Sequence, residues 1–138
     1  MDELDGIAAA DAHLGRPVPL PAAPLPLTRW GRVSAVSPDG VEVEWNLDDS
    51  RAGAPGRLAL YVGYAPPPQR DWPGDDAART VSVAGGDAEW REAELLEAEP
   101  SLRPAVEVTW RAHGLHLRIT AQGPWTPERL VEIAESVA

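Results

Sequence analysis

The amino-acid sequence predicts an α+β fold: a curved antiparallel sheet of about five to seven strands, packed by a C-terminal helix, with a short N-terminal helix and a proline-rich strap. Three observations support this prediction. Several short segments alternate apolar and polar residues, which is typical of strands with one buried face. The last segment changes to a helical period. Five prolines lie within residues 16–27. The length of 138 residues fits one domain over residues 1–138.

The clearest hairpin is predicted at residues 106–120. Val106, Val108 and Trp110 alternate with polar residues in the first arm, and Gly114 supplies the backbone freedom that a tight reversal needs. The second arm has apolar residues at alternate positions: Leu115, Leu117 and Ile119. The opposite face carries three charged residues that we expect to pair across the strands: Glu107, Arg111 and Arg118.

A helix is predicted directly after this hairpin. Thr126 is a favourable N-cap, Pro127 suits the first helical position, and Glu128 complements the helix dipole. One stripe of apolar residues follows at helical spacing: Leu130, Ile133, Ala134 and Val137. A helix this short is marginal alone, so we expect it to pack on the apolar face of the hairpin.

Further strands are predicted at residues 28–36, 41–47, 57–64 and 80–84. Residues 57–64 are apolar on both faces, which favours a central strand. Residues 88–96 combine good helix formers with a position between two strands, and this context favours a strand over a helix.

The sequence of the N-terminal region predicts a helix at residues 2–14, with Gly15 as its C-terminal stop. Residues 16–27 contain five prolines and are therefore extended. One interpretation is a docking site for a proline-reading domain. The favoured one is a strap that packs on the sheet through its apolar residues: Val18, Leu20, Leu25 and Leu27.

The charge balance bears on the partners of the chain. It has 12 basic and 22 acidic residues, a net charge of −10, which disfavours nucleic acid and anionic membrane surfaces. No apolar run approaches the roughly 20 residues that span a bilayer. The acidic N-terminus does not resemble a signal peptide, so we expect a cytoplasmic protein without membrane insertion, with export left open for a processed chain.

The sequence contains no motif for nucleotide, zinc or calcium binding, and it has no cysteine. His113 falls in the predicted turn and His116 faces away from the apolar residues, so two exposed histidines are expected rather than a metal site. Acidic pairs at Asp48-Asp49 and Asp75-Asp76 are expected to be solvated loop charge. We therefore expect no cofactor, no metal and no defined catalytic residue.

The candidate binding residues are mainly aromatic. Residues 122–125, Gln-Gly-Pro-Trp, form a rigid corner before the C-terminal helix, so Trp125 either seals the sheet–helix junction or forms one wall of an apolar groove. The groove hypothesis assigns five residues to this wall and its surroundings: Trp110, Trp125, Trp72, Arg103 and Tyr64.

Three functions are compatible with these features. The first is a non-catalytic binding or regulatory module that engages a protein partner or a small apolar ligand. The second is a small hydrolase-type enzyme in which His113 or His116 meets a carboxylate. The third is a structural protein that forms a homodimer through an exposed strand edge or helix face.

The C-terminal pattern VTWRAHGLHLRIT…WTPERLVEIAESV resembles a bacterial family of domains of unknown function. Its members occur as stand-alone proteins and in outer regions of anti-sigma-factor-like and lipoprotein chains. Residues 15–21 resemble the family's opening Gly-x-Pro-Val-x-Leu-Pro more loosely, and the resemblance is poor across residues 48–100. The resemblance implies an antiparallel sheet with helices packed on it and assigns no catalytic residues. The chain departs from the exported members because it has no lipobox, which does not support a cell-envelope role.

Overall fold

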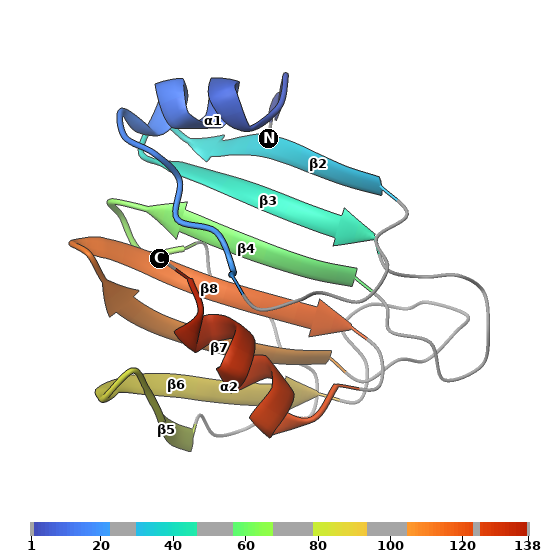
Figure 1. The fold of residues 1–138 in the computed structure, drawn as a ribbon, viewed down its shortest axis with the longest axis vertical. Coiled ribbons are helices and arrows are strands. Elements are labelled where there is room, and N and C mark those ends of the chain that lie inside the picture. The colour runs from blue at the N-terminus through green and yellow to red at the C-terminus, as the bar shows by residue number, and fades with distance from the viewer. Residues whose placement is uncertain are drawn as a thin grey trace.

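An eight-stranded antiparallel sheet with two helices forms the described part of the chain (Figure 1). The computed structural model describes residues 2–22, 30–46, 57–67, 79–93, 105–122 and 125–137. The elements in chain order are β1 (Asp2–Leu4), α1 (Ile7–Leu14), β2 (Trp30–Ser37), β3 (Gly40–Asn46), β4 (Arg57–Gly63), β5 (Arg79–Val83), β6 (Gly86–Ala93), β7 (Ala105–Ala112), β8 (Leu115–Gln122) and α2 (Pro127–Glu135).

The strand order is β1-β2-β3-β4-β8-β7-β6-β5, so each half of the chain builds one half of the sheet. The two halves join where β8 pairs with β4, with Leu60 opposite Ile119 and Tyr61 opposite Arg118. Residues 58–63 of β4 are buried on both faces, which confirms the prediction of a central strand.

The α+β class, the antiparallel sheet and the packed C-terminal helix are confirmed, but the prediction of five to seven strands is wrong. The additional strand is β1, which lies in the segment predicted to be helical from residue 2. Its three residues are too few for a period to be read, and their extended backbone depends on pairing with β2, where Leu4 lies opposite Val33. Gly6, with φ of 90°, then separates β1 from α1.

One face of the sheet, called here the helix face, packs against α1 and α2. The sheet contributes a continuous set of buried apolar side chains, among them Val43, Leu60, Val62, Val108, Leu117 and Ile119. Ala10 and Leu14 of α1 and Leu130 and Ile133 of α2 join the same core. Burying a side chain such as Leu130, which is 0% exposed, contributes about 1.5–3 kcal/mol, so the helix face is the main source of stability.

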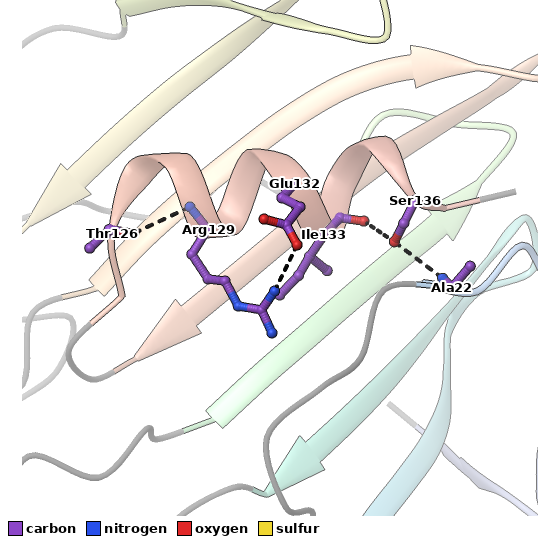
Figure 2. A network of polar contacts seen from close by, with 6 residues as sticks. All are labelled: Ala22, Thr126, Arg129, Glu132, Ile133 and Ser136. Atoms are coloured by element: carbon purple, nitrogen blue, oxygen red, sulfur yellow. Dashed lines mark hydrogen bonds and ion pairs between the residues drawn. The ribbon is translucent and has the colours of Figure 1, made fainter.

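The start of α2 follows the predicted capping pattern. The Thr126 side chain accepts a hydrogen bond from the Arg129 backbone N–H at 3.2 Å, and Pro127 occupies the first turn. Arg129 also forms an ion pair with Glu132 on the exposed side of the helix (Figure 2). The N-terminal signals in the sequence therefore position α2 as expected.

The described part of the strap joins the N-terminal region to the end of α2. Val18 is buried and Leu20 packs against the core, as predicted. Beyond them, the Ala22 backbone N–H donates to the hydroxyl of Ser136 at 3.1 Å (Figure 2) and also to the Ser136 carbonyl oxygen at 3.1 Å. The same hydroxyl donates to the Ile133 carbonyl at 2.7 Å. Leu25 and Leu27 lie outside the described residues.

The turns of two hairpins in the second half of the chain each contain a pair of residues with left-handed backbone. His113 and Gly114 have φ of 58° and 74°, and Ala84 and Gly85 have φ of 51° and 82°. Positive φ at both central residues is the backbone of a type I′ turn, whose twist matches that of the adjoining strands. The hairpin predicted at residues 106–120 is confirmed, and so is the helix stop at Gly15, which has φ of 80°.

Residues 88–96, which combined helix formers with a position between two strands, form a strand as far as Ala93, because β6 pairs with both β5 and β7. Ala88 and Trp90 point into the core, where Trp90 lies opposite Val108. Long-range packing of Trp90 thus outweighs the helix propensity of its neighbours. Residues 94–96 lie outside the described part.

Candidate functional site

The second face of the sheet, called here the polar face, brings polar side chains from the four strands β3, β4, β8 and β7 into rows. Across one row, Glu42 of β3 lies opposite Tyr61 of β4, Tyr61 opposite Arg118 of β8, and Arg118 opposite Thr109 of β7. The adjacent row contains Thr120 opposite Glu107. Residues from both halves of the chain therefore meet in the middle of this face.

Arg118 forms the centre of a charged cluster on the polar face. Its Nε atom lies 3.6 Å from a carboxylate oxygen of Glu107, and its Nη2 atom lies 4.0 Å from one of Glu42. The Thr120 hydroxyl donates to the Glu107 carboxylate at 3.3 Å. The side chains of Arg118, Glu107 and Glu42 are only 6%, 8% and 13% exposed. Charges so far withdrawn from water require paired partners, and this cluster supplies them.

The Tyr61 ring lies beside this cluster. The Arg118 guanidinium carbon is 5.8 Å from the ring centroid, within the range of a cation–π interaction. The Tyr61 hydroxyl donates to the Ala65 carbonyl at 2.7 Å and so holds the chain that leaves β4. Burial raises the pKa of Tyr61, the positive charge of Arg118 lowers it, and the Asp39 carboxylate raises it; the first effect is the largest.

Two glycines make room for that ring. Gly40 and Gly63 lie opposite each other on β3 and β4. A Cβ atom at Gly40 would lie 2.7 Å from both Cε2 and the hydroxyl oxygen of Tyr61, and one at Gly63 would also overlap the ring. The phenol therefore occupies space on the polar face that side chains at these two positions would otherwise fill.

A second polar arrangement lies nearer the β7–β8 turn. Arg111 and His116 are directly opposite each other on β7 and β8, which places two basic side chains side by side. The pKa of His116 is lowered, first by partial burial and second by the positive charge of Arg111. Gly63 is the neighbour of His116 on its other side. Arg16 reaches the turn itself and donates to the His113 carbonyl at 2.9 Å.

The described residues of the predicted groove lie at different places in the fold. Trp110 is 6% exposed and belongs to the core of the helix face, opposite Leu117. Trp125 is half-buried against the core before α2, at the far end of β8 from Trp110. Tyr64, which follows β4, is 48% exposed. Trp72 and Arg103 lie outside the described residues. Trp110 and Trp125 therefore do not face each other across one groove.

The hypothesis of a hydrolase requires a histidine that contacts a carboxylate. His13 Nε2 donates to the Ser37 carbonyl at 2.7 Å, His113 is exposed in the turn, and His116 faces Arg111. Within the described ranges, none of the three forms an ion pair with a carboxylate. The same part of the chain contains no group of three or more His, Asp or Glu residues that could hold a metal ion.

Sequence reasoning missed Glu42, Tyr61 and Thr120 as members of one cluster. Pairing among Glu107, Arg111 and Arg118 was expected from the hairpin; it is confirmed for Glu107 with Arg118, whereas Arg111 forms no ion pair within the described ranges. Thr120 belongs to the same hairpin, opposite Glu107, whereas Glu42 and Tyr61 come from β3 and β4, which the sequence does not place beside β8. The only sequence signal is the bulky polar-tipped Tyr61 on the second face of an otherwise apolar strand.

Comparisons with protein-family models, with curated proteins and with solved structures found no match. The resemblance of the C-terminal pattern to a bacterial domain family thus stays a prediction. No helix in the described ranges has the length and apolar character needed to cross a membrane.

Proposed function

We propose that this protein is a non-catalytic binding module that engages a protein partner through the polar face of its sheet. The helix face is occupied by α1, α2 and the strap, which bury its apolar side chains. The polar face presents accessible arginine and glutamate side chains on paired strands. Arginine is enriched where proteins bind one another, and rigid strands reduce the ordering cost of binding.

The observation that supports the proposal best is the contrast between the centre and the rim of this face. At the centre, Arg118 is fixed by two carboxylates and Tyr61 is 1% exposed. At the rim, the side chains of Arg32 and Arg91 are each 41% exposed, and Glu89 is 59% exposed. A rigid centre with accessible charged residues around it suits recognition by complementary charge.

A protein partner is favoured over a small apolar ligand because the accessible side chains at this rim are charged. An apolar ligand would need apolar walls, yet Trp110 is already packed into the core of the helix face. A charged rim on a broad, rigid sheet matches the polar periphery of protein–protein interfaces instead.

Site-specific photo-crosslinking tests the proposal with two matched positions. Glu89 on the polar face and Glu132 on α2 have similar side-chain exposure, 59% and 63%. Benzoylphenylalanine replaces one or the other in the full chain, which is then irradiated in lysate of the source cells. We expect a protein adduct from position 89 that excess unlabelled chain suppresses, and none from position 132.

The captured protein is then purified and titrated against the unlabelled chain by calorimetry. Saturable binding at a fixed stoichiometry supports the proposal. Absence of an adduct at position 89, the same adduct at both positions, or a captured protein that does not bind in calorimetry would each overturn it.

A further inference from the structure

The arginines of the polar face differ in how their charges are balanced. Arg32 lies 3.0 Å from Glu44, Arg91 lies 3.8 Å from Glu89, and Arg118 is shared by two carboxylates. Arg111, exposed on the same face, forms no ion pair or side-chain hydrogen bond with any residue in the described ranges. This is unexpected in a chain with 22 acidic residues and 12 basic ones.

The neighbours of Arg111 add to the unbalanced positive charge at this position. Its cross-strand partner is His116, and a like-charged pair in this position destabilises the sheet when both are ionised. Among the described residues, Arg111 of β7 lies directly opposite His116 and Gly63 of β4 lies on its other side. The next charged or titratable groups on this face are Arg118, two positions along β8, and Tyr61, which pairs with Arg118. Glu42 of β3 is close to Arg118, whose charge it offsets together with Glu107.

We infer that Arg111 and His116 form a binding site for a side-chain carboxylate in an acidic segment of the protein partner. The inference rests on the proposed function and specifies the chemistry of the partner. A guanidinium offers parallel N–H donors that match both oxygens of a carboxylate, and a protonated imidazole adds a further charged donor. The bound anion removes the repulsion within the Arg111–His116 pair.

The overall charge of −10 does not prevent this contact. At physiological ionic strength the Debye length is about 8 Å, so distant acidic groups are largely screened. A carboxylate at hydrogen-bond distance therefore interacts mainly with Arg111 and His116. The net charge limits the rate of approach of an acidic segment more than the strength of its final contact.

Protonation of His116 is coupled to binding. Burial and Arg111 lower the pKa of this imidazole in the free protein, and a bound carboxylate opposes the effect of Arg111. A bound acidic segment is therefore expected to raise the pKa of His116. By linkage, the affinity must then increase as the pH falls through that pKa.

NMR of the full chain tests the inference without the natural partner. The probe is a blocked peptide with three adjacent glutamates, and the control is its glutamine counterpart. We expect the glutamate peptide to shift the Arg111 Nε–Hε and His116 ring resonances in a saturable manner and to raise the measured pKa of His116. The glutamine peptide should leave both unchanged. Equal shifts with both peptides, or none with the glutamate peptide, would overturn the inference.

Two variants separate the site from general charge on the same face. Arg111→Gln should weaken glutamate-peptide binding about tenfold or more, the effect of one charge-assisted hydrogen bond. Arg91→Gln removes an equal charge from an arginine that is paired with Glu89, and its affinity should stay within about twofold of wild type. Equal losses in the two variants would contradict a specific site. If a phosphoserine peptide gave the same shifts at a tenth of the concentration of the glutamate peptide, a carboxylate would not be the natural ligand.

The outcomes distinguish this inference from the function on which it rests. If photo-crosslinking identifies a partner but the glutamate peptide does not bind, the binding module stands and the carboxylate site fails. If the peptide binds at Arg111 but no partner is captured, the site stands and the proposed function fails.

Discussion

The Arg118 guanidinium and the Glu107 carboxylate form a 3.6 Å ion pair on the sheet face opposite the helices, and both side chains are at least nine-tenths buried. Arg118 comes from β8 and Glu107 from β7, so the two lie in adjacent rows of one hairpin. The polar face is thus ordered at its centre by a charged network, in contrast to the apolar packing of the helix face. This arrangement makes the fold sensitive to single changes in the network.

Arg118→Met is expected to destabilise the protein by about 3–5 kcal/mol, the cost of leaving buried carboxylates without their shared cation. The substitution keeps much of the side-chain volume, so loss of charge dominates the effect. The free energy of unfolding from urea titration followed by tryptophan fluorescence measures it. Arg129→Met is the matched control, because Arg129 and Glu132 are 35% and 63% exposed, and its cost should stay below about 1 kcal/mol. Similar losses in both variants would contradict this account of the network.

The two glycines around Tyr61 provide a second prediction. Gly40→Ala and Gly63→Ala should each cost about 1–3 kcal/mol through overpacking. The three atoms nearest the added Cβ at Gly40 all belong to Tyr61, whereas those at Gly63 include the backbone oxygen of Asp39 at 2.8 Å. In a Tyr61→Val background, the cost of Gly40→Ala should therefore largely disappear and that of Gly63→Ala should persist.

A double-mutant cycle with urea unfolding measures this difference. The interaction energy between positions 40 and 61 should be about 1 kcal/mol or more, and that between positions 63 and 61 should be smaller. If Tyr61→Val rescues both alanine variants equally, the backbone contact at Gly63 does not limit substitution there.

The β5–β6 turn offers a stabilising substitution. Ala84 has φ of 51°, and a left-handed backbone costs an ordinary L-residue roughly 1–2 kcal/mol. Asparagine tolerates this conformation, and Asn-Gly is the preferred pair for a type I′ turn. Ala84→Asn should thus raise the free energy of unfolding by about 0.5–1 kcal/mol. The Ala84 N–H bond to the Glu135 carboxylate, 3.0 Å long, is retained because its donor is the backbone.

Gly85→Ala is the companion variant for this turn. Gly85 has φ of 82°, so an added Cβ is strained even though no atom lies within 4 Å of it. The two substitutions should therefore shift the urea midpoint in opposite directions. A lower midpoint for Ala84→Asn would show that the turn does not adopt this backbone in solution.

Local patterns in the sequence predicted those elements whose signals are themselves local. The period of two in residues 106–120 and the capping of α2 by Thr126 need only near neighbours. By contrast, β1 is extended because β2 pairs with it, and no property of Asp2–Leu4 alone indicates this. The left-handed backbone of Ala84 was also missed, because alanine does not favour it and the hairpin around it imposes it.

The candidate site was predictable only within one hairpin. Glu107 and Arg118 are close in sequence and on the same face, so their pairing followed from the alternation. Glu42 and Tyr61 join them because β8 inserts beside β4, a contact between the two halves of the chain. Sequence spacing contains no information on that choice of neighbour. The conspicuous tryptophan Trp110, in turn, is part of the core because it lies on the helix face of β7, opposite Leu117.

The last prediction concerns the pH dependence that Tyr61 introduces. Its pKa is raised, mainly by burial, above the value of 10.0 expected for an unfolded chain. At a pH just above 10, the unfolded state has therefore lost the phenol proton more completely than the folded state. The unfolded state binds fewer protons there, so the free energy of unfolding must fall as the pH rises through this range.

Absorbance at 295 nm follows ionisation of the phenols in the native protein. The chain has two tyrosines, so Tyr61→Phe leaves Tyr64 as the remaining phenol, and subtracting its titration curve from that of wild type isolates Tyr61. The isolated curve should have its midpoint above pH 10.0. Wild type should also lose stability between pH 9 and 10.5 more steeply than Tyr61→Phe, although the variant starts about 1 kcal/mol lower without the hydrogen bond to Ala65. A midpoint at or below pH 10.0 would mean that the Tyr61 phenol is accessible to solvent and that the side chains at the centre of the polar face are not buried.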